Sequence, residues 1–390
     1  MLEAPPRRFF AATEVDDMTL DLAAIQAAAG RLQGQIERTP CRHSKTLSKI
    51  TGAEVWVKFE NLQFTAAYKE RGALNKLMLL SETEKQRGVI AASAGNHAQG
   101  LAYHGARLGV PVTIVMPKTT PFVKVQHTRD FGATVVIEGE TYDDANAHAR
   151  KLRDEQGLTF VHPFDDYDIM AGQGTIALEM LEDAPDLEVL PVPIGGGGLI
   201  SGVATAAKAL KPDIRIIGCE PAMYPSFTAR MRGVAAHCGG QTIAEGVAVK
   251  QVGDLTYGVV RPLIDDVLLL EEPHLEQAVS LYCNVEKLIL CGGNIDTRLL
   301  ASVLTRELVR AQRLVSLRII GDDRPGLLST VASVIGTMGA NIIEVNHNRL
   351  ALDVPAKGAE FDITIETRDA QHTQEVMEAL RESGYPPRAV

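Results

Sequence analysis

Short runs of apolar and β-branched residues alternate with alanine-rich helical segments from about residue 20 to Cys219. Continuous apolar runs of this length are typical of strands that are buried on both faces of a parallel sheet. Their alternation with helices, such as Ala98–Leu108, predicts right-handed βαβ units and an α/β fold with mostly parallel sheets. Ligands of such sheets bind at the carboxyl ends of the strands. The predicted strands are Val55–Phe59, Gly88–Ala92, Val112–Met116, Thr134–Ile137, Thr159–Val161, Val189–Ile194 and Ile214–Cys219.

The pattern changes after about residue 310, where two amphipathic helices are interspersed with three longer strands. The order β-α-β-β-α, with room for a last short strand, predicts a ferredoxin-like α+β domain. We therefore expect one domain over residues 1–310 and a second over 314–390, joined by the polar segment Arg306–Arg313. The predicted strands are Leu314–Gly321, Asn341–Leu352 and Glu360–Thr367, and the predicted helices are Pro325–Met338 and Gln371–Ser383.

Composition and charge point to small-molecule chemistry in a soluble protein. Of 390 residues, 45% are hydrophobic and 23% are charged, and 39 basic against 49 acidic residues give a net charge of −10. We therefore expect neither nucleic acid nor an anionic membrane as a partner. No stretch approaches the roughly 18 apolar residues of a membrane span. Five cysteines, an odd number without zinc-ligand spacing, suggest a reducing cytoplasm and no metal site.

Lys69 lies where a predicted strand gives way to a helix, in the segment Phe59–Lys76. A lysine at such a junction can be held rigidly and partly desolvated, which lowers its pKa. The neutral amine can then form an imine with a carbonyl cofactor. A solvated lysine at a helix start is the alternative for this residue taken alone.

Two further segments each follow a strand and open a helix. In Ala91–Gly100, small residues and the polar side chains of Ser93, Asn96 and His97 suit a carboxylate at a helix N-terminus. A helix cap with a buried structural histidine would explain part of this pattern. Gly195, Gly196, Gly197 and Gly198 are expected to turn successive amides around a phosphate, since no simple structural need uses four consecutive glycines.

A dinucleotide-binding loop is the alternative for the four glycines, because Glu220 ends the next strand where a ribose-binding acid would stand. The GxGxxG pattern would need glycine at Ile200 or Ser201, so a single phosphate fits better. A fourth segment, Leu288–Asp296, places Cys291 at the mouth of the sheet. This thiol is either a small buried filler or a weak hydrogen-bond partner for a heteroaromatic nitrogen.

Together, the four segments resemble the threonine ammonia-lyase (threonine dehydratase) family of pyridoxal-phosphate enzymes, which includes serine dehydratases and serine racemase. The resemblance covers about residues 20 to 305, although the usual Ser-Phe-Lys reads Ala67-Tyr68-Lys69 here. It implies a two-lobed, tryptophan-synthase β-like fold with a smaller inserted lobe at about 64–158. It also implies these roles: Lys69 as the imine-forming lysine, Asn96 beside the cofactor phenolic oxygen, Gly195 to Gly198 around the phosphate, Cys291 beside the pyridine nitrogen, and Ser93, Asn96 and His97 around the substrate carboxylate.

The reaction implied is loss of water and ammonia from L-threonine, and more poorly from L-serine, giving 2-oxobutanoate in the case of threonine. A neutral thiol at the pyridine nitrogen favours elimination over transamination, because it does not keep the ring protonated. Racemases of this family resemble Ser-Ser-Gly-Asn-His, and their second serine is Ala94 here. Racemisation is therefore the less favoured chemistry, and a nicotinamide dehydrogenase is weakened by the failed glycine pattern.

The chain departs from the family in two places. Members that bind a divalent cation use a glutamate followed six residues later by an acid, whereas Glu220 is followed by Ser226, so no strong metal site is expected. The family also places roughly a helix and a strand before the Cys-Gly-Gly-Asn motif, whereas here residues 284–287 run directly into Leu288. A catalytically silent amino-acid-binding scaffold is therefore the second hypothesis.

The C-terminal unit resembles an ACT domain, in which the turn Gly321–Gly326 leads from the first strand to the first helix. Such domains commonly bind a regulatory amino acid at this turn, using free helix amides for its carboxylate. Pairing of ACT domains implies a homo-oligomer. A dimerisation module without a ligand is the alternative.

Overall fold

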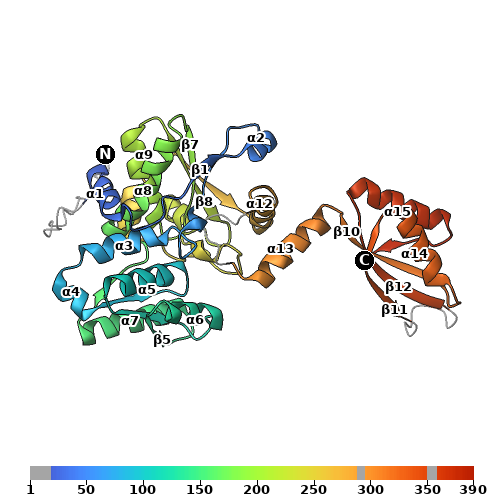
Figure 1. The fold of residues 1–390 in the computed structure, drawn as a ribbon, viewed down its shortest axis with the longest axis horizontal. Coiled ribbons are helices and arrows are strands. Elements are labelled where there is room, and N and C mark those ends of the chain that lie inside the picture. The colour runs from blue at the N-terminus through green and yellow to red at the C-terminus, as the bar shows by residue number, and fades with distance from the viewer. Residues whose placement is uncertain (1–18, 288–294, 349–357) are drawn as a thin grey trace, which may run out of the picture. The chain divides into compact units, whose positions relative to one another are not determined.

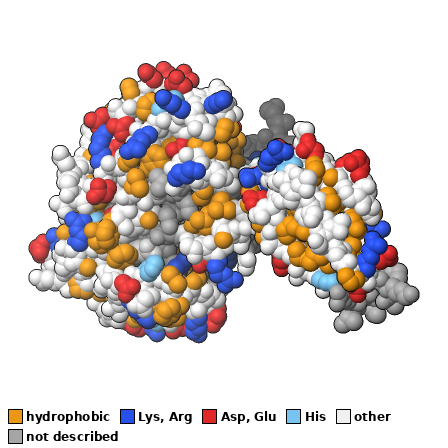
Figure 2. All heavy atoms as spheres, turned by 45° about the vertical axis from the view of Figure 1, so that its right-hand side comes forward, with side chains coloured by type: hydrophobic (Ala, Val, Ile, Leu, Met, Phe, Trp, Pro, Cys, Tyr) orange, Lys and Arg blue, Asp and Glu red, His pale blue; other side chains and the backbone are white. Residues whose placement is uncertain are grey.

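The computed structural model describes residues 19–287, 295–348 and 358–390. Two compact units are present, of which the first holds Met1–Leu275 and Val285–Asn294 and the second holds Glu276–Asn284 and Ile295–Val390. No helix among the described residues is long and apolar enough to cross a membrane. Acidic and basic side chains are interspersed over the face seen in Figure 2.

The first unit contains two lobes, each with a parallel sheet flanked by helices (Figure 1). Its strands are β1 (Cys41–His43), β2 (Trp56–Lys58), β3 (Val89–Ala92), β4 (Val112–Met116), β5 (Thr134–Ile137), β6 (Thr159–Phe160), β7 (Val189–Pro193), β8 (Arg215–Pro221) and β9 (Asp266–Leu270). Its helices up to the end of the smaller lobe are α1 (Leu22–Leu32), α2 (Lys45–Thr51), α3 (Lys69–Leu79), α4 (Glu82–Arg87), α5 (Asn96–Leu108), α6 (Phe122–Asp130) and α7 (Tyr142–Gln156). They are followed by α8 (Tyr167–Asp183), α9 (Gly198–Leu210), α10 (Ser226–Arg232), α11 (Asp254–Val260) and α12 (Glu272–Val285), which continues into the second unit.

The smaller lobe has the strand order β5-β4-β3-β6, with every neighbouring pair parallel. Ile90 and Ala92 point into a core with α7, whereas Val89 and Ala91 point into a second core with α3, α5 and α6. The alternation along β3 therefore buries both faces of the sheet, as the continuous apolar runs predict. The lobe extends to Phe160, slightly beyond the expected limit near residue 158.

The larger lobe has the parallel order β7-β8-β9, and α1, α8 and α9 contribute to its core. The prediction that Val55–Phe59 contains a buried strand of the parallel sheets is wrong. β2 instead pairs antiparallel with β1 in a separate sheet of two strands. A short apolar run specifies a strand but not its partner, because pairing depends on distant residues.

Close helix crossings fix the start of α3. A Cβ atom added to Gly172 would lie 2.6 Å from the carbonyl oxygen of Arg71, and one added to Gly202 would lie 2.1 Å from that of Met170. Glycines therefore allow α3, α8 and α9 to approach closely. Arg71 is completely buried and donates to Glu60 and Glu179. Burial alone would lower the pKa of Arg71, but these carboxylates outweigh it and raise the pKa.

The second unit has an antiparallel sheet with the strand order β11-β12-β10-β13, and its core includes residues of two helices. Its elements are α13 (Thr297–Arg310), β10 (Leu314–Asp322), α14 (Leu327–Thr337), β11 (Asn341–Asn348), β12 (Gly358–Glu366), α15 (Ala370–Glu382) and β13 (Arg388–Ala389). The predicted order of strands and helices is present. The polar segment 306–313 is not simply a linker, because α13 continues through Arg310 and Arg310 binds Glu276. Residues 349–352 of the predicted second strand lie outside the described residues.

Candidate active site

Lys69 is the first residue of α3 and is partly buried. Its Nζ atom donates to the carbonyl oxygen of Pro163 at 2.6 Å, and no carboxylate in the described part of the chain pairs with it. Burial lowers the pKa of Lys69 to about 8. An enclosed amine without a counter-ion is costly, so such a lysine indicates a functional site.

The segment after β3 supplies Ser93 and leads into α5, which begins at Asn96. Amide groups in the first turn of a helix have no intrahelical acceptor and attract anions. The carboxylate site predicted from the sequence therefore lies at a helix N-terminus.

His97 differs from its predicted role in one respect. Its Nε2 atom is 3.2 Å from the carbonyl oxygen of Val161, which can only accept, so Nε2 carries the proton. Burial, the nearby Lys69 amine and His162 lower the pKa of His97 to about 3, against the opposing effect of the Val161 carbonyl. Nδ1 is buried and has no partner among the described residues. The imidazole therefore offers an acceptor, and only the backbone amide of His97 could donate to a carboxylate.

The four glycines connect β7 to α9, and none of their amide groups donates to another described residue. Gly197 has a φ of +96°, a left-handed conformation that favours glycine. Successive unpaired amides at a helix N-terminus form an anion-binding concavity.

Close packing also requires glycine in this loop, which corrects the expectation that no simple structural need explains it. Cβ atoms added to Gly196 and Gly198 would lie 2.3 Å and 2.8 Å from atoms of Phe164. The equivalent distance from Gly195 to the Cα of Val247 is 2.9 Å, and that from Gly197 to Thr256 is 2.8 Å. The loop therefore presents its amides because the opposite side of its backbone is crowded.

Residues 161–165, which were not predicted as site residues, connect these parts. Val161 binds His97, Pro163 binds Lys69, and Phe164 contacts Gly196 and Gly198. Asp165 accepts from the amides of Asp254 and Thr256, and the Thr256 hydroxyl donates to the carbonyl oxygen of Gly196 at 2.7 Å. The segment follows β6, so its position after a parallel strand could have drawn attention to it.

Glu220 is excluded as a free ribose-binding or metal-binding acid. Its carboxylate accepts from the amides of Phe227 and Thr228 and from the Thr228 hydroxyl. These bonds secure the start of α10, while burial raises the pKa of Glu220. Cys291, the predicted partner of a ring nitrogen, lies outside the described residues together with the rest of 288–294.

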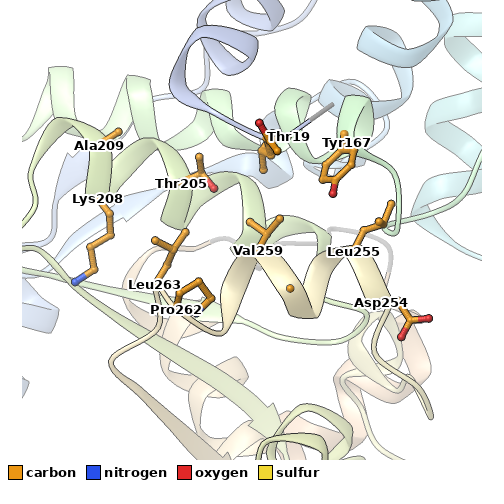
Figure 3. A pocket seen from close by; sticks show the side chains of 12 residues that line it. Thr19, Tyr167, Thr205, Lys208, Ala209, Asp254, Leu255, Val259, Pro262 and Leu263 are labelled. Carbon is orange, nitrogen blue, oxygen red and sulfur yellow. The ribbon is translucent and has the colours of Figure 1, made fainter. Parts of the chain in front are cut away.

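A separate open groove of about 630 Å³ lies beside α9 and α11. In Figure 3, Tyr167 and Thr19 line one side of it, opposite Leu255 and Val259. None of the predicted site residues lines this groove, so it is distinct from the predicted catalytic site.

Comparison with known proteins identifies the class. Residues 32–295 match the model of the pyridoxal-phosphate dependent enzyme family, and residues 310–384 match that of the ACT domain. The chain belongs to the pyridoxal-phosphate dependent enzyme family, and the predicted two-lobed α/β fold with a C-terminal ACT domain is confirmed.

Individual relatives within this family act as threonine ammonia-lyases, threonine deaminases or serine racemases, by their names. The chain is 39% identical to the L-threonine ammonia-lyase of Thermotoga maritima, with 95% of this chain and 100% of the relative covered. Threonine deaminase isoform 2 of Solanum lycopersicum matches with a TM-score of 0.68 and 34% identity, over 73% of this chain and 86% of that structure. Maize serine racemase matches with a TM-score of 0.69 and 29% identity, over 75% and 99%.

The alignment with the Thermotoga relative also has a length that can be compared with the segment expected to be missing before Leu288. It extends over 399 positions but includes 95% of the 390 residues of this chain. Nearly thirty positions of the relative therefore have no counterpart here. This difference has the size expected of a missing helix and strand.

Proposed function

We propose that this chain is a threonine ammonia-lyase, which uses pyridoxal phosphate to convert L-threonine into 2-oxobutanoate and ammonia and acts more poorly on L-serine. The observation that carries the proposal is the combination of Lys69, an amine with a lowered pKa, and a glycine loop with four unpaired amides. Residues 161–165 contact both, through the Lys69–Pro163 hydrogen bond and the packing of Phe164 against the loop. The relatives named above support the choice of substrate.

The site fits this cofactor by its donor set. Gly195, Gly196, Gly197 and Gly198 would hold the phosphate through backbone amides, and the Lys69 amine would hold the aldehyde carbon. Asn96 would lie beside the phenolic oxygen and Cys291 beside the pyridine nitrogen. When bound, the cofactor supplies an electron sink that makes the Cα hydrogen of an amino acid acidic.

The chain's own residues then bind the substrate and move its proton. Ser93, Asn96 and the first-turn amides of α5 would orient the substrate carboxylate. The lowered pKa of about 8 makes the neutral Lys69 amine more available, and this amine would take the proton from Cα. The β-hydroxyl would receive a proton with the help of the bound phosphate and leave as water, and hydrolysis of the product would release 2-oxobutanoate and ammonia. The unpaired Nδ1 of His97 would accept a hydrogen bond from the bound molecules rather than donate one.

Removing the amine tests the assignment. Lys69→Ala is expected to abolish both the visible absorption of the bound cofactor and the production of 2-oxobutanoate, because both depend on the imine formed by this amine. Lys85→Ala is the matched control, since Lys85 lies on α4 and pairs only locally with Glu82. Release of ammonia from L-threonine at an unchanged rate by Lys69→Ala would refute the catalytic assignment.

The ACT domain is proposed to be regulatory, with an amino-acid effector bound near the turn 321–326 and with assembly of the chain into a homo-oligomer. Ending the chain before Leu314 should preserve elimination but remove its response to amino acids, because coupling needs a second site. Inhibition that persists in the shortened chain would place the effector site elsewhere. A cytoplasmic location is proposed with it, and the four described cysteines are free.

A further inference from the structure

Glu70 directly follows Lys69 but has no part in the proposed chemistry. Its side chain is 2% exposed. One carboxylate oxygen, Oε1, accepts from the backbone amide of Thr65, and the other, Oε2, is 3.2 Å from Nε2 of His104. A buried carboxylate therefore connects the loop before Lys69 to helix α5.

The neighbouring hydrogen bonds determine the tautomer of His104. Arg107 places Nη1 at 3.1 Å from Nδ1 of His104, and a guanidinium group can only donate. Nδ1 must therefore accept, which leaves the proton of the neutral ring on Nε2, where it is donated to Glu70. Arg107 is held in turn by the backbone and side-chain oxygens of Gln35.

The same face of α5 contacts the start of α3. A Cβ atom added to Gly100 would lie 3.4 Å from the backbone of Glu70 and 3.5 Å from that of Lys69. His104 follows Gly100 by one helical turn, so both residues face α3. Because α5 begins at Asn96 and α3 begins at Lys69, this contact relates the amine to the carboxylate-binding end of α5.

The loop before Lys69 needs such support. Ala66 has a φ of +57°, a left-handed backbone conformation that is strained for a residue other than glycine. The strained residue lies next to Thr65, the residue whose amide Glu70 holds. Strain of this kind persists only where surrounding contacts enforce it.

We propose that Glu70 and His104 are positioning residues, which hold the loop before Lys69 against α5 and thereby set the place of the amine relative to the substrate carboxylate. The consequence for turnover rests on the proposed function, whereas the order of the loop does not. Neither side chain would contact the substrate, since both would act by holding the loop and α5 together.

Glu70→Gln is the sharpest test. The new side-chain oxygen can still accept from Thr65, but its amide group faces the donor Nε2–H of His104. We expect hydrogen exchange of the amides in residues 63–68 of the full chain to become about tenfold faster, and borohydride-trapped labelling of Lys69 by pyridoxal phosphate to become about tenfold slower. The kcat for L-threonine should fall while its KM changes little.

Adding Arg107→Met to Glu70→Gln should reverse most of the loss. Without the guanidinium, His104 can move its proton to Nδ1 and accept from the glutamine amide at Nε2. Arg107→Met alone should resemble the parent chain, as should Glu82→Gln, whose side chain is exposed on α4. Recovery on removing a second contact is not expected if Glu70 only contributes to stability.

The proposal is overturned if Glu70→Gln matches the parent in exchange and labelling, or if the double variant is no better than Glu70→Gln. Should Glu70→Gln fail to fold, His104→Gln and His104→Leu test the same link, because only the glutamine can donate to Glu70. Equal exchange in these two variants would also overturn the proposal. Absence of turnover in the parent, with the exchange pattern as expected, would refute the proposed function and leave the positioning pair standing.

Discussion

One wall of the site, formed by Lys69, α5 and the glycine loop, is packed more completely than β9 and the chain that follows it. In the wall, all four residues of β3 are buried, and residues 161–165 contact His97, Lys69 and the glycine loop. By contrast, Leu268 and Leu269 of β9 remain 47% and 40% exposed, on opposite faces of the strand. A parallel strand with an apolar sequence is normally covered on both faces.

The chain after β9 also carries local strain. Helix α12 ends at Val285, and Lys287 has a φ of +58° immediately before the segment outside the described residues. The helix and strand that the sequence analysis expects to be missing would belong to this same part of the chain. We therefore expect the candidate catalytic groups to be in place while the apolar packing around β9 is incomplete.

Adding the helix and strand that the family places before the Cys-Gly-Gly-Asn motif should produce the largest effect. Inserting the corresponding segment of a relative between Lys287 and Leu288 should tighten pyridoxal-phosphate binding at least about tenfold, or about 1.4 kcal/mol, and raise turnover of L-threonine. The reason is that exposed apolar surface becomes buried and water is excluded from the site. Cofactor titration and initial rates of both chains under the same conditions measure this.

A glycine-serine insert of the same length provides the control, because it restores chain length without apolar cover. Equal affinity and turnover in the parent chain and the restored chain would show that the segment is dispensable. The silent-scaffold alternative would then lose its main support.

The wall formed by Lys69, α5 and the glycine loop should be sensitive to much smaller changes, such as a single added methyl group. Gly196→Ala places a Cβ atom 2.3 Å from the Phe164 ring, so the loop must shift, at a cost of about 1–3 kcal/mol in the free energy of unfolding. Cofactor affinity should fall with it. Gly30→Ala in the last turn of α1, where nothing lies within 4 Å of the added Cβ atom, should instead stabilise the fold by up to about 1 kcal/mol. Chemical denaturation distinguishes them, and equal stability of the two variants would contradict the packing argument.

Stability at acidic pH should depend on two histidines in this part of the site, His97 and His162. Burial is the main cause that lowers the pKa of His97 to about 3 and that of His162 to about 4, from an unfolded value of 6.5. Between these values the unfolded chain binds protons that the folded chain does not. The free energy of unfolding therefore decreases as the pH falls below 6.5, by about 1 to 2 kcal/mol per histidine at pH 5.

Denaturation of the cofactor-free chain from pH 7.5 to 5 tests the histidine contribution. Replacing His97 and His162 by glutamine should flatten the dependence, whereas His127→Asn on exposed helix α6 should not. An unchanged slope in the double variant would assign the acid sensitivity to other groups.

Much of the architecture around the site could be predicted because it depends on local sequence. Val112–Met116 and Thr134–Ile137 are strands with the predicted bounds, since continuous apolar β-branched runs leave little choice. Lys69 and the four glycines could be selected as candidates because their neighbours in the sequence already place them between a strand and a helix. The antiparallel pairing of β2 with β1 could not be predicted in this way, because the local sequence of a strand does not specify its partner.

The remaining site features depend on contacts between distant segments. Phe164 explains the glycines only when α9 and residues 161–165 are brought together. The acceptor character of His97 follows from a carbonyl group 64 residues away. Glu220 resembled a ligand-binding acid until α10 was seen to use its carboxylate. Sequence patterns identify reactive groups, whereas tertiary contacts decide their protonation and availability.

The smallest expected effect concerns the type of reaction. Ala94→Ser supplies a hydroxyl beside Ser93 on the complete wall, where the racemase pattern has its second serine. A hydroxyl on the opposite face of the cofactor could return a proton to Cα, so a trace of D-serine should form from L-serine while elimination continues. Chiral chromatography of the recovered serine measures this, with Ser93→Ala in the same background showing whether the first hydroxyl can substitute. Serine that stays entirely in the L-form would mean that the side chain at Ala94 does not select between elimination and racemisation.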